Sequence, residues 1–445
     1  MGLQLTATQV TAMAPDASSA SAGKKLGDPK HWKNLGINEQ VLWGECQGSA
    51  LYQVRVVPST LTIRCSCPSR KQPCKHGLGL LLLAVNHPET LTNTEPPEWV
   101  TDWLAKQAAV AKRKETVEEN KAAGKVPTTS AKTAEKRLQQ VKAGVEHLDR
   151  WLNDLVRNGI GTLETQPTTF WENQAARMVD NQAPGLASRL RRMSTIPNSA
   201  ANWPEKLLSQ LGLLALLSET FQRLDQFEPA FQEDVRQLIG WTVKEDEVVV
   251  SGERVTDDWL FLGQLVEETE RGKNQRTWLL GRKTKRSALA FQFSYAGQPF
   301  AETYALGSRQ KATLVYWPGV QPQRALLHKR EGEHLSVQER LPGHATCAAF
   351  FDEVATTLAL CPWRERFLCV LQDAVPVYEP AHNQWWIYDQ QQQAIPLQKQ
   401  DHWSLLALSG GHPVDFVGEW NGEMLTPLGV LVDHTYHLLV YEDLA

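Results

Sequence analysis

Four residues within a short stretch of the sequence constrain what this chain can fold into more than any other feature. Cys65, Cys67, Cys74 and His76 follow one another in the order Cys-x-Cys-x6-Cys-x-His. Zn2+ is bound tetrahedrally by thiolates and imidazoles in closed structural sites. Side chains two positions apart in extended backbone point to the same side, so each pair of ligands can bind one ion. The pattern therefore predicts one structural zinc ion held by these four residues.

Other interpretations of the cysteines fit the pattern less well. A disulfide framework would leave one of the three unpaired, and the N-terminal sequence has no basic segment before an apolar core, so we expect no signal peptide. Buried thiols without a ligand and redox chemistry at Cys65 or Cys67 remain alternatives. A catalytic zinc ion would need an open coordination position, and a set of four protein ligands leaves none.

The sequence around this motif predicts a small mixed structure. Residues 41–49 and 52–57 are typical of two strands joined by a Gly-Ser turn, and residues 61–64 of a third strand that leads to the first cysteine. Residues 76–85 are too apolar for a surface loop and are followed by a proline, which favours a buried helix.

Strands, two cysteines, a loop and a Cys-x-His pair that opens a helix resemble the SWIM zinc finger. The stretch CSCPSRKQPCKHGLGLLLL resembles in particular the bacterial SWIM proteins, whose genes tend to lie beside those of MoxR-type AAA+ ATPases and von Willebrand A domain proteins. The resemblance covers roughly residues 10–190. It implies a zinc-binding, non-enzymatic adaptor whose partners are a MoxR-type AAA+ ATPase and a von Willebrand A domain protein. The alternative it implies is DNA binding, which SWIM fingers in transposases and recombination accessory proteins are thought to perform.

Basic residues gather around the motif although the whole chain is acidic. The net charge is −4, but residues 1–150 hold 20 Lys and Arg against 14 Asp and Glu, and the remainder holds 26 against 36. Arg70, Lys71 and Lys75 lie inside or beside the predicted metal loop, where they are candidates for contact with a protein partner or with phosphates. The competing interpretation is that they offset the net −1 charge of a zinc ion bound by three thiolates.

Composition and periodicity divide the chain into four segments. Residues 1–104 hold the N-terminal part with the finger at about 41–87, and residues 105–130 are typical of a charged helix or linker. Residues 131–240 predict a helical domain, and residues 241–445 predict a β-rich α+β domain, with two related subdomains as one interpretation. The expected fold class is therefore α+β and multidomain: a small ββ(β)α zinc finger, a helical bundle and a β-rich C-terminal region.

Five helices are expected within the helical domain. Its most apolar segment, residues 204–227, places seven leucines in the middle of the bundle, namely Leu207, Leu208, Leu211, Leu213, Leu214, Leu216 and Leu217. Arg189, Arg191 and Arg192 are expected on the surface at the end of the preceding helix. Ahead of the finger, Asp16 is expected to cap a short helix.

The C-terminal region shows strand-like runs separated by polar turns. Residues 248–250 and 403–408 are among the expected strands. One amphipathic helix is expected at residues 346–360 with Phe351 facing inward. The Asn-Gly pair at residues 421–422 indicates a hairpin.

Motifs for catalysis are not found. The sequence has no GxxxxGK[ST] phosphate loop and no GxSxG, HExxH or protein-kinase signature. A weaker candidate metal site combines three histidines with two nearby aspartates: His412, His434, His437, Asp415 and Asp433. No apolar run is long enough to cross a bilayer, and the other cysteines are scattered, as in a reducing compartment. We therefore expect a cytoplasmic, non-enzymatic protein without a membrane segment.

Overall fold

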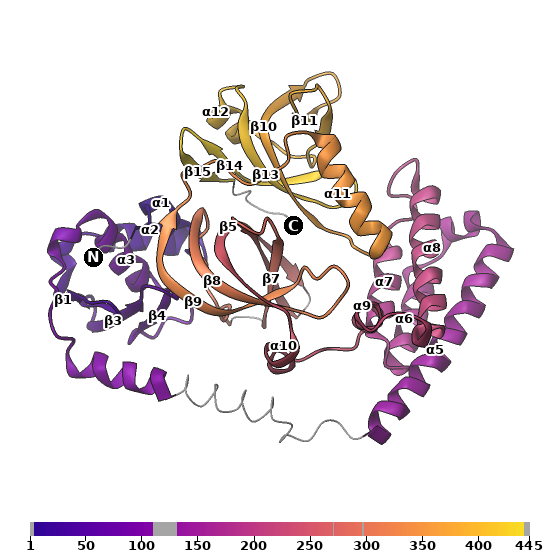
Figure 1. The fold of residues 1–445 in the computed structure, drawn as a ribbon, viewed down its shortest axis with the longest axis horizontal. Coiled ribbons are helices and arrows are strands. Elements are labelled where there is room, and N and C mark those ends of the chain that lie inside the picture. Colours follow the sequence, from indigo (N-terminus) through magenta and orange to yellow (C-terminus); the bar gives the residue numbers. More distant parts are fainter. Residues whose placement is uncertain (1–3, 110–130, 270, 296–297, 440–445) are drawn as a thin grey trace.

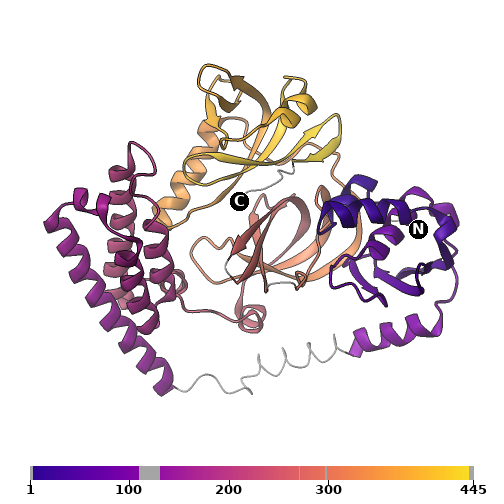
Figure 2. The same ribbon diagram turned by 180° about the vertical axis from the view of Figure 1, so that it is seen from behind.

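The computed structural model describes residues 4–109, 131–269, 271–295 and 298–439. It has the predicted α+β architecture: an N-terminal finger domain, a helical bundle and two small β-barrels (Figure 1). The barrels lie in the middle, with the finger domain on one side and the bundle on the other (Figures 1 and 2). The helix or linker predicted within residues 105–130 lies mostly outside the described residues.

The finger domain is a four-stranded antiparallel sheet with two helices before it and a third after it. Its strands pair in the order β1-β2-β3-β4. The helices are α1 (Ala7–Ala12), α2 (Ala17–Leu26) and α3 (Lys75–Asn86); the strands are β1 (Trp32–Ile37), β2 (Leu42–Gln47), β3 (Leu51–Val57) and β4 (Thr62–Cys65). Asp16 caps α2 as predicted, by accepting a hydrogen bond from the backbone N–H of Ser19 at 2.7 Å. Strand β1 was not expected, because its register shifts between Lys33 and Gly36 and its residues do not alternate.

Both faces of this sheet are covered. Helix α3 packs against one face together with α1 and α2. Helical residues 98–109 cover the other face, where Val100 and Trp103 pack on Trp43. The guanidinium of Arg55 lies over the rings of Trp99 and Trp103, at 5.6 and 5.2 Å from their centroids. The finger is therefore closed by its flanking helices and is larger than the metal motif alone.

The helical domain has the five predicted helices. They are α5 (Ala131–Asn158), α6 (Thr168–Asp180), α7 (Pro184–Met193), α8 (Trp203–Gln222) and α9 (Pro229–Ile239). The prediction that every leucine of α8 lies in the bundle was wrong: Leu208 is 53% and Leu216 42% exposed, so α8 keeps an exposed face although it contacts α5, α7 and α9. Arg189 was expected on the surface but is buried, and it donates a hydrogen bond to Glu365 at 3.1 Å.

The first barrel begins after a short helix that replaces a predicted strand. Residues 248–250 belong to α10 (Glu245–Ser251), because three acidic residues in its first turn favour the N-terminal end of a helix. The barrel strands pair in the order β7-β6-β5-β8-β9. They are β5 (Arg254–Thr269), β6 (Gly272–Gly281), β7 (Ser287–Tyr295), β8 (Ser308–Tyr316) and β9 (Ala325–Ser336).

The second barrel follows α11 (Cys347–Leu360), the predicted amphipathic helix. Its strands pair in the order β12-β11-β10-β13-β14-β15. They are β10 (Phe367–Glu379), β11 (Gln384–Tyr388), β12 (Ala394–Pro396), β13 (Val414–Trp420), β14 (Leu425–Val432) and β15 (Thr435–Leu438). The Asn-Gly hairpin joins β13 to β14 as predicted.

Two expectations for the second barrel were wrong. Residues 403–408 form a helix, α12 (Trp403–Ser409), which ends at the left-handed residue Gly410 and buries Leu405 against the barrel. Phe351 of α11 is 37% exposed rather than inward, and its ring contacts that of Trp420 edge to face. Short apolar runs do not distinguish a strand from a helix by periodicity alone.

The finger domain docks on the first barrel through buried polar contacts. The side-chain amide of Gln310 donates to the carbonyl of Ser59 at 2.7 Å, and Arg330 donates to the carbonyl of Thr60 at 2.8 Å. Gln9 of α1 donates to the carbonyl of Gly307 at 2.6 Å. On the other side, the indole of Trp363 donates to the carbonyl of Leu213 in the bundle at 2.8 Å. Within the described part of the chain, no helix is long and apolar enough to cross a membrane.

Candidate metal centre

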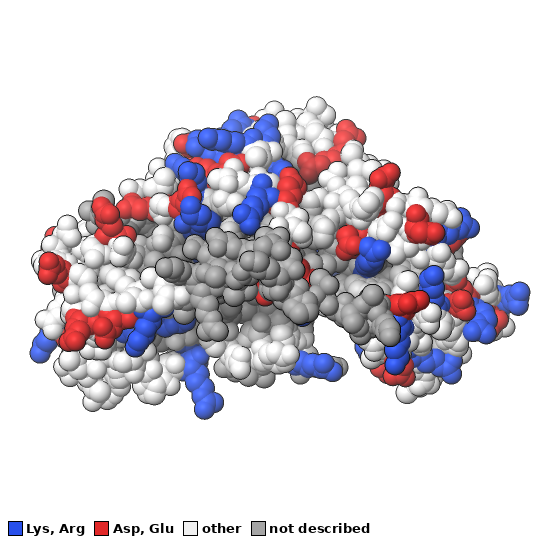
Figure 3. All heavy atoms as spheres, turned by 60° about the horizontal axis from the view of Figure 1, so that its bottom comes forward, with Lys and Arg blue, Asp and Glu red and all other residues white. Residues whose placement is uncertain are grey.

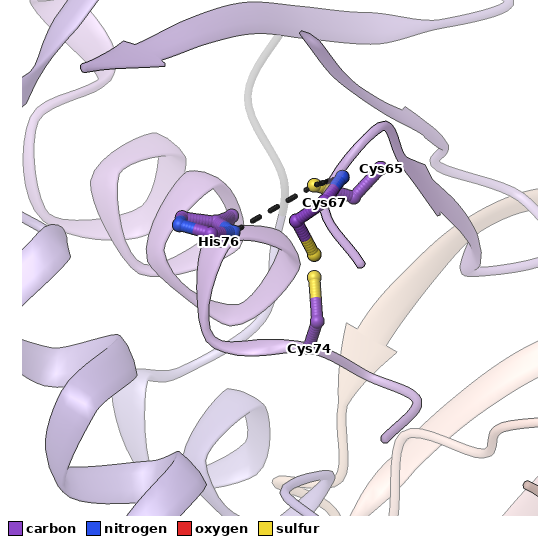
Figure 4. A group of neighbouring side chains, drawn as sticks. All are labelled: Cys65, Cys67, Cys74 and His76. Atoms are coloured by element: carbon purple, nitrogen blue, oxygen red, sulfur yellow. Dashed lines mark hydrogen bonds between the residues drawn. The ribbon is translucent and has the colours of Figure 1, made fainter. Parts of the chain in front are cut away.

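The four predicted ligands converge at one point of the finger (Figure 4). Cys65 is the last residue of β4, Cys67 follows it in the metal loop, Cys74 caps α3, and His76 lies in the first turn of that helix. Their ligand atoms all lie within 4.8 Å of one another, and Cys65 Sγ is 3.7 Å from His76 Nδ1. The two pairs of the motif therefore approach one position from a strand and from a helix.

This arrangement fits a tetrahedral zinc ion. With Zn–S bonds of about 2.3 Å and a Zn–N bond of about 2.0 Å, the ligand atoms of a tetrahedron are roughly 3.5 to 3.8 Å apart. The 3.7 Å separation of Cys65 Sγ and His76 Nδ1 is within that range. Three soft thiols and one imidazole are a donor set typical of structural zinc. Cys65, Cys67, Cys74 and His76 are thus positioned to hold one zinc ion.

The thiols of the cluster share their protons unequally. The pKa of Cys74 is lowered, chiefly because the Cys65 thiol donates a hydrogen bond to it. The same hydrogen bond raises the pKa of Cys65, and burial raises that of Cys67. Because zinc binds thiolates, its binding to these cysteines would release thiol protons.

Helix α3 presents His76 through close packing at its first turn. The backbone N–H of Gly77 donates to Cys74 Sγ at 3.4 Å, so one ligand also serves as the helix cap. A Cβ at Gly77 would lie 2.5 Å from Cγ2 of Ile63 in β4, so only glycine lets the helix lie this close to the strand that carries Cys65. The ring of Tyr52 lies 4.6 Å from that of His76 at an interplanar angle of 31°, which covers the imidazole on one side.

Tyr52 and Gly77 are site residues that the sequence did not single out. Tyr52 lies in β3, where it pairs with Cys46 of β2. Pairing of β3 with β4 places Val54 opposite Cys65, and this register is the signal that could have placed Tyr52 near the ligands. The requirement for glycine after the histidine depends on the distance between α3 and β4, which the sequence does not encode in a recognisable motif.

The three basic residues in or beside the metal loop, residues 67–74, have different surroundings. Arg70, Lys71 and Lys75 are all exposed. Lys71 Nζ lies 2.7 Å from a carboxylate oxygen of Asp16, the residue that caps α2, and this ion pair lowers the pKa of Asp16 to about 2. Lys71 therefore joins the metal loop to α2, whereas Arg70 and Lys75 are the better candidates for contact with a partner.

The weaker candidate site in the second barrel is not assembled. Among the described residues, the only group of His, Cys, Asp and Glu side chains close enough to hold a metal ion is the one in the finger. His434 Nδ1 instead lies 3.0 Å from the carbonyl oxygen of Gln338, and Asp415 accepts a hydrogen bond from the backbone N–H of Leu341 at 2.9 Å. These residues hold the barrel to the segment that precedes it.

Comparison with protein-family models gave two matches along this chain. The SWIM zinc finger matches residues 52–84, which include all four ligands, and the SWIM-associated four-helix bundle domain matches residues 136–239, which include most of α5 and all of α6 to α9. Comparisons with curated proteins and with solved structures gave no match. The chain therefore carries a SWIM zinc finger followed by a SWIM-associated four-helix bundle domain.

Proposed function

We propose that this protein is a cytoplasmic, non-enzymatic adaptor whose SWIM finger binds a partner protein through its metal loop. A MoxR-type AAA+ ATPase and a von Willebrand A domain protein are the proposed partners, because the sequence around the finger resembles the bacterial SWIM proteins encoded beside them. In this proposal zinc has a structural role, since all four positions of the tetrahedron are filled by protein ligands.

The exposure of the metal loop carries this proposal. Residues 68–71 are exposed, whereas the sheet behind them is covered on both faces and the far end of the domain docks on the first barrel. The loop is held at Cys67 and Cys74 and by the ion pair of Lys71. The fixed loop presents Arg70 in a defined direction, and Lys75 is held at the first position of α3. This order reduces the entropy lost on binding.

DNA binding by the same finger is the second candidate. Between Cys46 and Pro88 the sequence holds five basic residues and no acidic one, which favours contact with phosphates. Against it, basic and acidic side chains are interspersed over the described part of the face in Figure 3, without a continuous positive band. The net charge of −4 for the whole chain also favours contact with a protein over contact with phosphates. The protein partner is therefore the preferred proposal.

A double variant tests the role of the loop. Arg70→Ala/Lys75→Ala should weaken binding to the purified MoxR-type or von Willebrand A protein of the same organism by about 1 kcal/mol or more per residue. Lys30→Ala/Lys33→Ala removes two exposed lysines elsewhere in the finger domain and serves as the control. Zinc content should stay the same in both.

The two candidate functions respond differently to salt. Binding to duplex DNA should weaken with a slope near 0.9 per phosphate neutralised, and this slope should fall in Arg70→Ala/Lys75→Ala. Steeply salt-dependent DNA binding together with unchanged protein binding would reverse the order of the two proposals. Wild-type affinity of the double variant for both ligands would remove the metal loop from the function.

A further inference from the structure

The two β-barrels share one topology, although the segments that connect their strands differ. In each, a long first strand pairs with both the second and the fourth strand. Strand β5 pairs with β8 over residues 254–261 and with β6 over residues 259–269. Strand β10 pairs with β13 over residues 367–374 and with β11 over residues 375–379.

Each barrel is closed in the same way. A parallel bridge joins Leu289 of the third strand to Arg324 beside the fifth in the first barrel, and Leu397 to Leu425 in the second. In the second barrel α12 lies between the third and fourth strands. This is the order of the five-stranded, partly open Greek-key barrel called the OB-fold. The C-terminal half therefore contains the same barrel twice, and equivalent faces of the two can be compared.

In the first barrel, the outer face of the first two strands is an interface. Trp278 and Leu280 of β6 lie on this face and pack with Val417 and Leu428 of the second barrel. The indole Nε1 of Trp278 donates to Glu419 of the second barrel at 2.7 Å. The second barrel contributes β13, β14 and the first residues of β10, Leu368 and Val370, to this contact, whereas the later part of β10 and all of β11 contribute no residue to it.

The outer face formed by the end of β10 and by β11 lies outside that contact. Trp386 of β11 lies opposite Val377 of β10, and its neighbours Trp385 and Ile387 fill the barrel interior, so Trp386 is on the outer face. Val377 is 37% exposed, and Trp386 and Tyr388 are half-buried. In Figure 1 β11 lies on the side of its barrel remote from the first barrel.

This face has a tryptophan whose polar atom is already satisfied. The indole Nε1 of Trp386 donates to Glu379 of the adjacent strand at 3.1 Å. The indole of Trp278 in the first barrel instead donates to Glu419 of the other barrel. The Glu379 carboxylate, which also lies 2.9 Å from Nδ1 of His382, fixes the ring of Trp386 and places an acidic group beside it. A ligand for this face need not supply an acceptor, and a positive charge would be favoured.

The charges of the two barrels have opposite signs. Residues 367–438 contain eight Asp and Glu and one basic residue, Lys399, whereas residues 254–336 contain thirteen Lys and Arg and eight Asp and Glu. The second barrel thus already packs against a basic neighbour. Its acidity disfavours nucleic acid, because phosphates would be repelled.

Arginine on aromatic rings is a contact that this chain uses repeatedly. The guanidinium of Arg324 lies 4.0 Å from the ring centroid of Trp317, and that of Arg286 lies 4.4 Å from that of Tyr316. We propose that the outer face of the second barrel, formed by Val375, Val377, Trp386, Tyr388 and Pro396, is a docking surface for a cationic segment of a partner protein, whose arginine or lysine side chains stack on Trp386. This surface lies outside the finger and does not depend on the metal loop.

A labelled peptide of alternating glycine and arginine tests this surface on the full-length protein. Fluorescence anisotropy should show binding that Val377→Lys weakens about tenfold, because the variant adds a positive charge at the centre of the face. Val266→Lys adds the same charge at a valine of the first barrel that is 38% exposed, and it should change the affinity less than twofold. Trp386→Ala should weaken binding about fivefold, the loss expected for one cation–π contact.

Trp403→Ala is the control for the loss of an aromatic ring, since Trp403 is 54% exposed on α12 and belongs to a different aromatic cluster. It should leave the affinity unchanged. Equal binding of the matching glycine–glutamate peptide, or equal loss in Val377→Lys and Val266→Lys, would overturn the proposal. So would binding of an oligosaccharide or of oligothymidine that Trp386→Ala abolishes, since OB-folds also bind those ligands.

Discussion

The indole Nε1 of Trp278 in the first barrel donates a hydrogen bond to the Glu419 carboxylate of the second barrel at 2.7 Å. Glu419 is 2% exposed and also accepts from Arg276 at 3.2 Å and from Arg366 at 2.7 Å. One buried carboxylate thus pairs with two guanidinium groups, whose second positive charge is offset by Glu267, and joins the two barrels. Its removal would leave Arg276, which is also buried, with Glu267 as its remaining carboxylate partner.

The first prediction follows from this contact. Glu419→Ala should lower the free energy of unfolding of the barrels by about 3 kcal/mol, the usual cost of removing one partner from a buried ion pair. The Glu423→Ala variant, which breaks an exposed ion pair with Lys206, should cost less than about 1 kcal/mol. Urea unfolding monitored by tryptophan fluorescence would measure both. Similar losses in the two variants would contradict the role given to Glu419.

The second prediction concerns the metal ion. Metal analysis of the purified protein should give about one zinc per chain, and Cys74→Ser should lose it, because that variant removes one of the four ligands. Cys46→Ser changes a buried thiol of the same domain outside the cluster and is the matched control. Full zinc content in Cys74→Ser would refute the ligand assignment.

The third prediction concerns what zinc stabilises. Structural zinc contributes on the order of 10 kcal/mol to the folding of small finger peptides. Chelation should therefore abolish the hydrogen-exchange protection of β4 and of α3, which carry Cys65 and His76. The two barrels should keep their protection, because their cores contain no ligand of the metal. Uniform loss throughout the chain, or none, would show that the finger is not a separate folding unit.

The fourth prediction is a pH dependence located at His334. Burial lowers the pKa of this histidine from 6.5 to about 3, and its Nδ1 lies 3.1 Å from Ser308 Oγ within the first barrel. Below pH 6.5 the unfolded chain binds a proton that the folded chain excludes, so stability falls as the pH decreases from about 6.5 towards 3. At pH 5.5 the loss should be about 1.4 kcal/mol.

Variants of two histidines isolate this effect. His334→Gln should flatten the decrease in unfolding free energy between pH 7 and pH 5.5, whereas His412→Gln, at an exposed histidine, should leave it unchanged. Zinc content must be measured at both pH values, since loss of the metal would also lower stability. The same slope in wild type and His334→Gln would show that another group is responsible.

The metal ligands and the helices of the bundle could be predicted because their signals are local. Ligand chemistry at fixed spacing identified Cys65 and His76, and proline and glycine marked the limits of α7 and α9. Strand β1 escaped because Asn34 takes a left-handed φ of 50° and breaks the alternation. Residues 248–250 and 403–408 are mostly apolar runs that could form a strand or a helix. Acidic residues in the first turn of α10 and the left-handed Gly410 after α12 favour the helix.

Relationships between distant segments were not predictable from one sequence. The ion pair of Lys71 with Asp16 and the contact of Trp278 with Glu419 depend on how domains pack. The duplication of the barrel left only the weak indication of two related subdomains, because the two copies share strand order and not sequence. Arg189 looked like a surface residue because its partner Glu365 lies 176 residues further along the chain.

The docking of the finger on the first barrel has a consequence for biosynthesis. Ser59, which the barrel binds through Gln310, is made 251 residues earlier than its partner. At roughly 5–20 residues per second, the ribosome needs about 13 to 50 seconds to complete that interval. During this time the finger has no barrel to lie against, and its folding depends on its own apolar core and on metal capture, both of which use residues already synthesised. The supply of zinc to the nascent chain would then set how long the finger stays unfolded. During that time the residues that later meet the barrel are exposed.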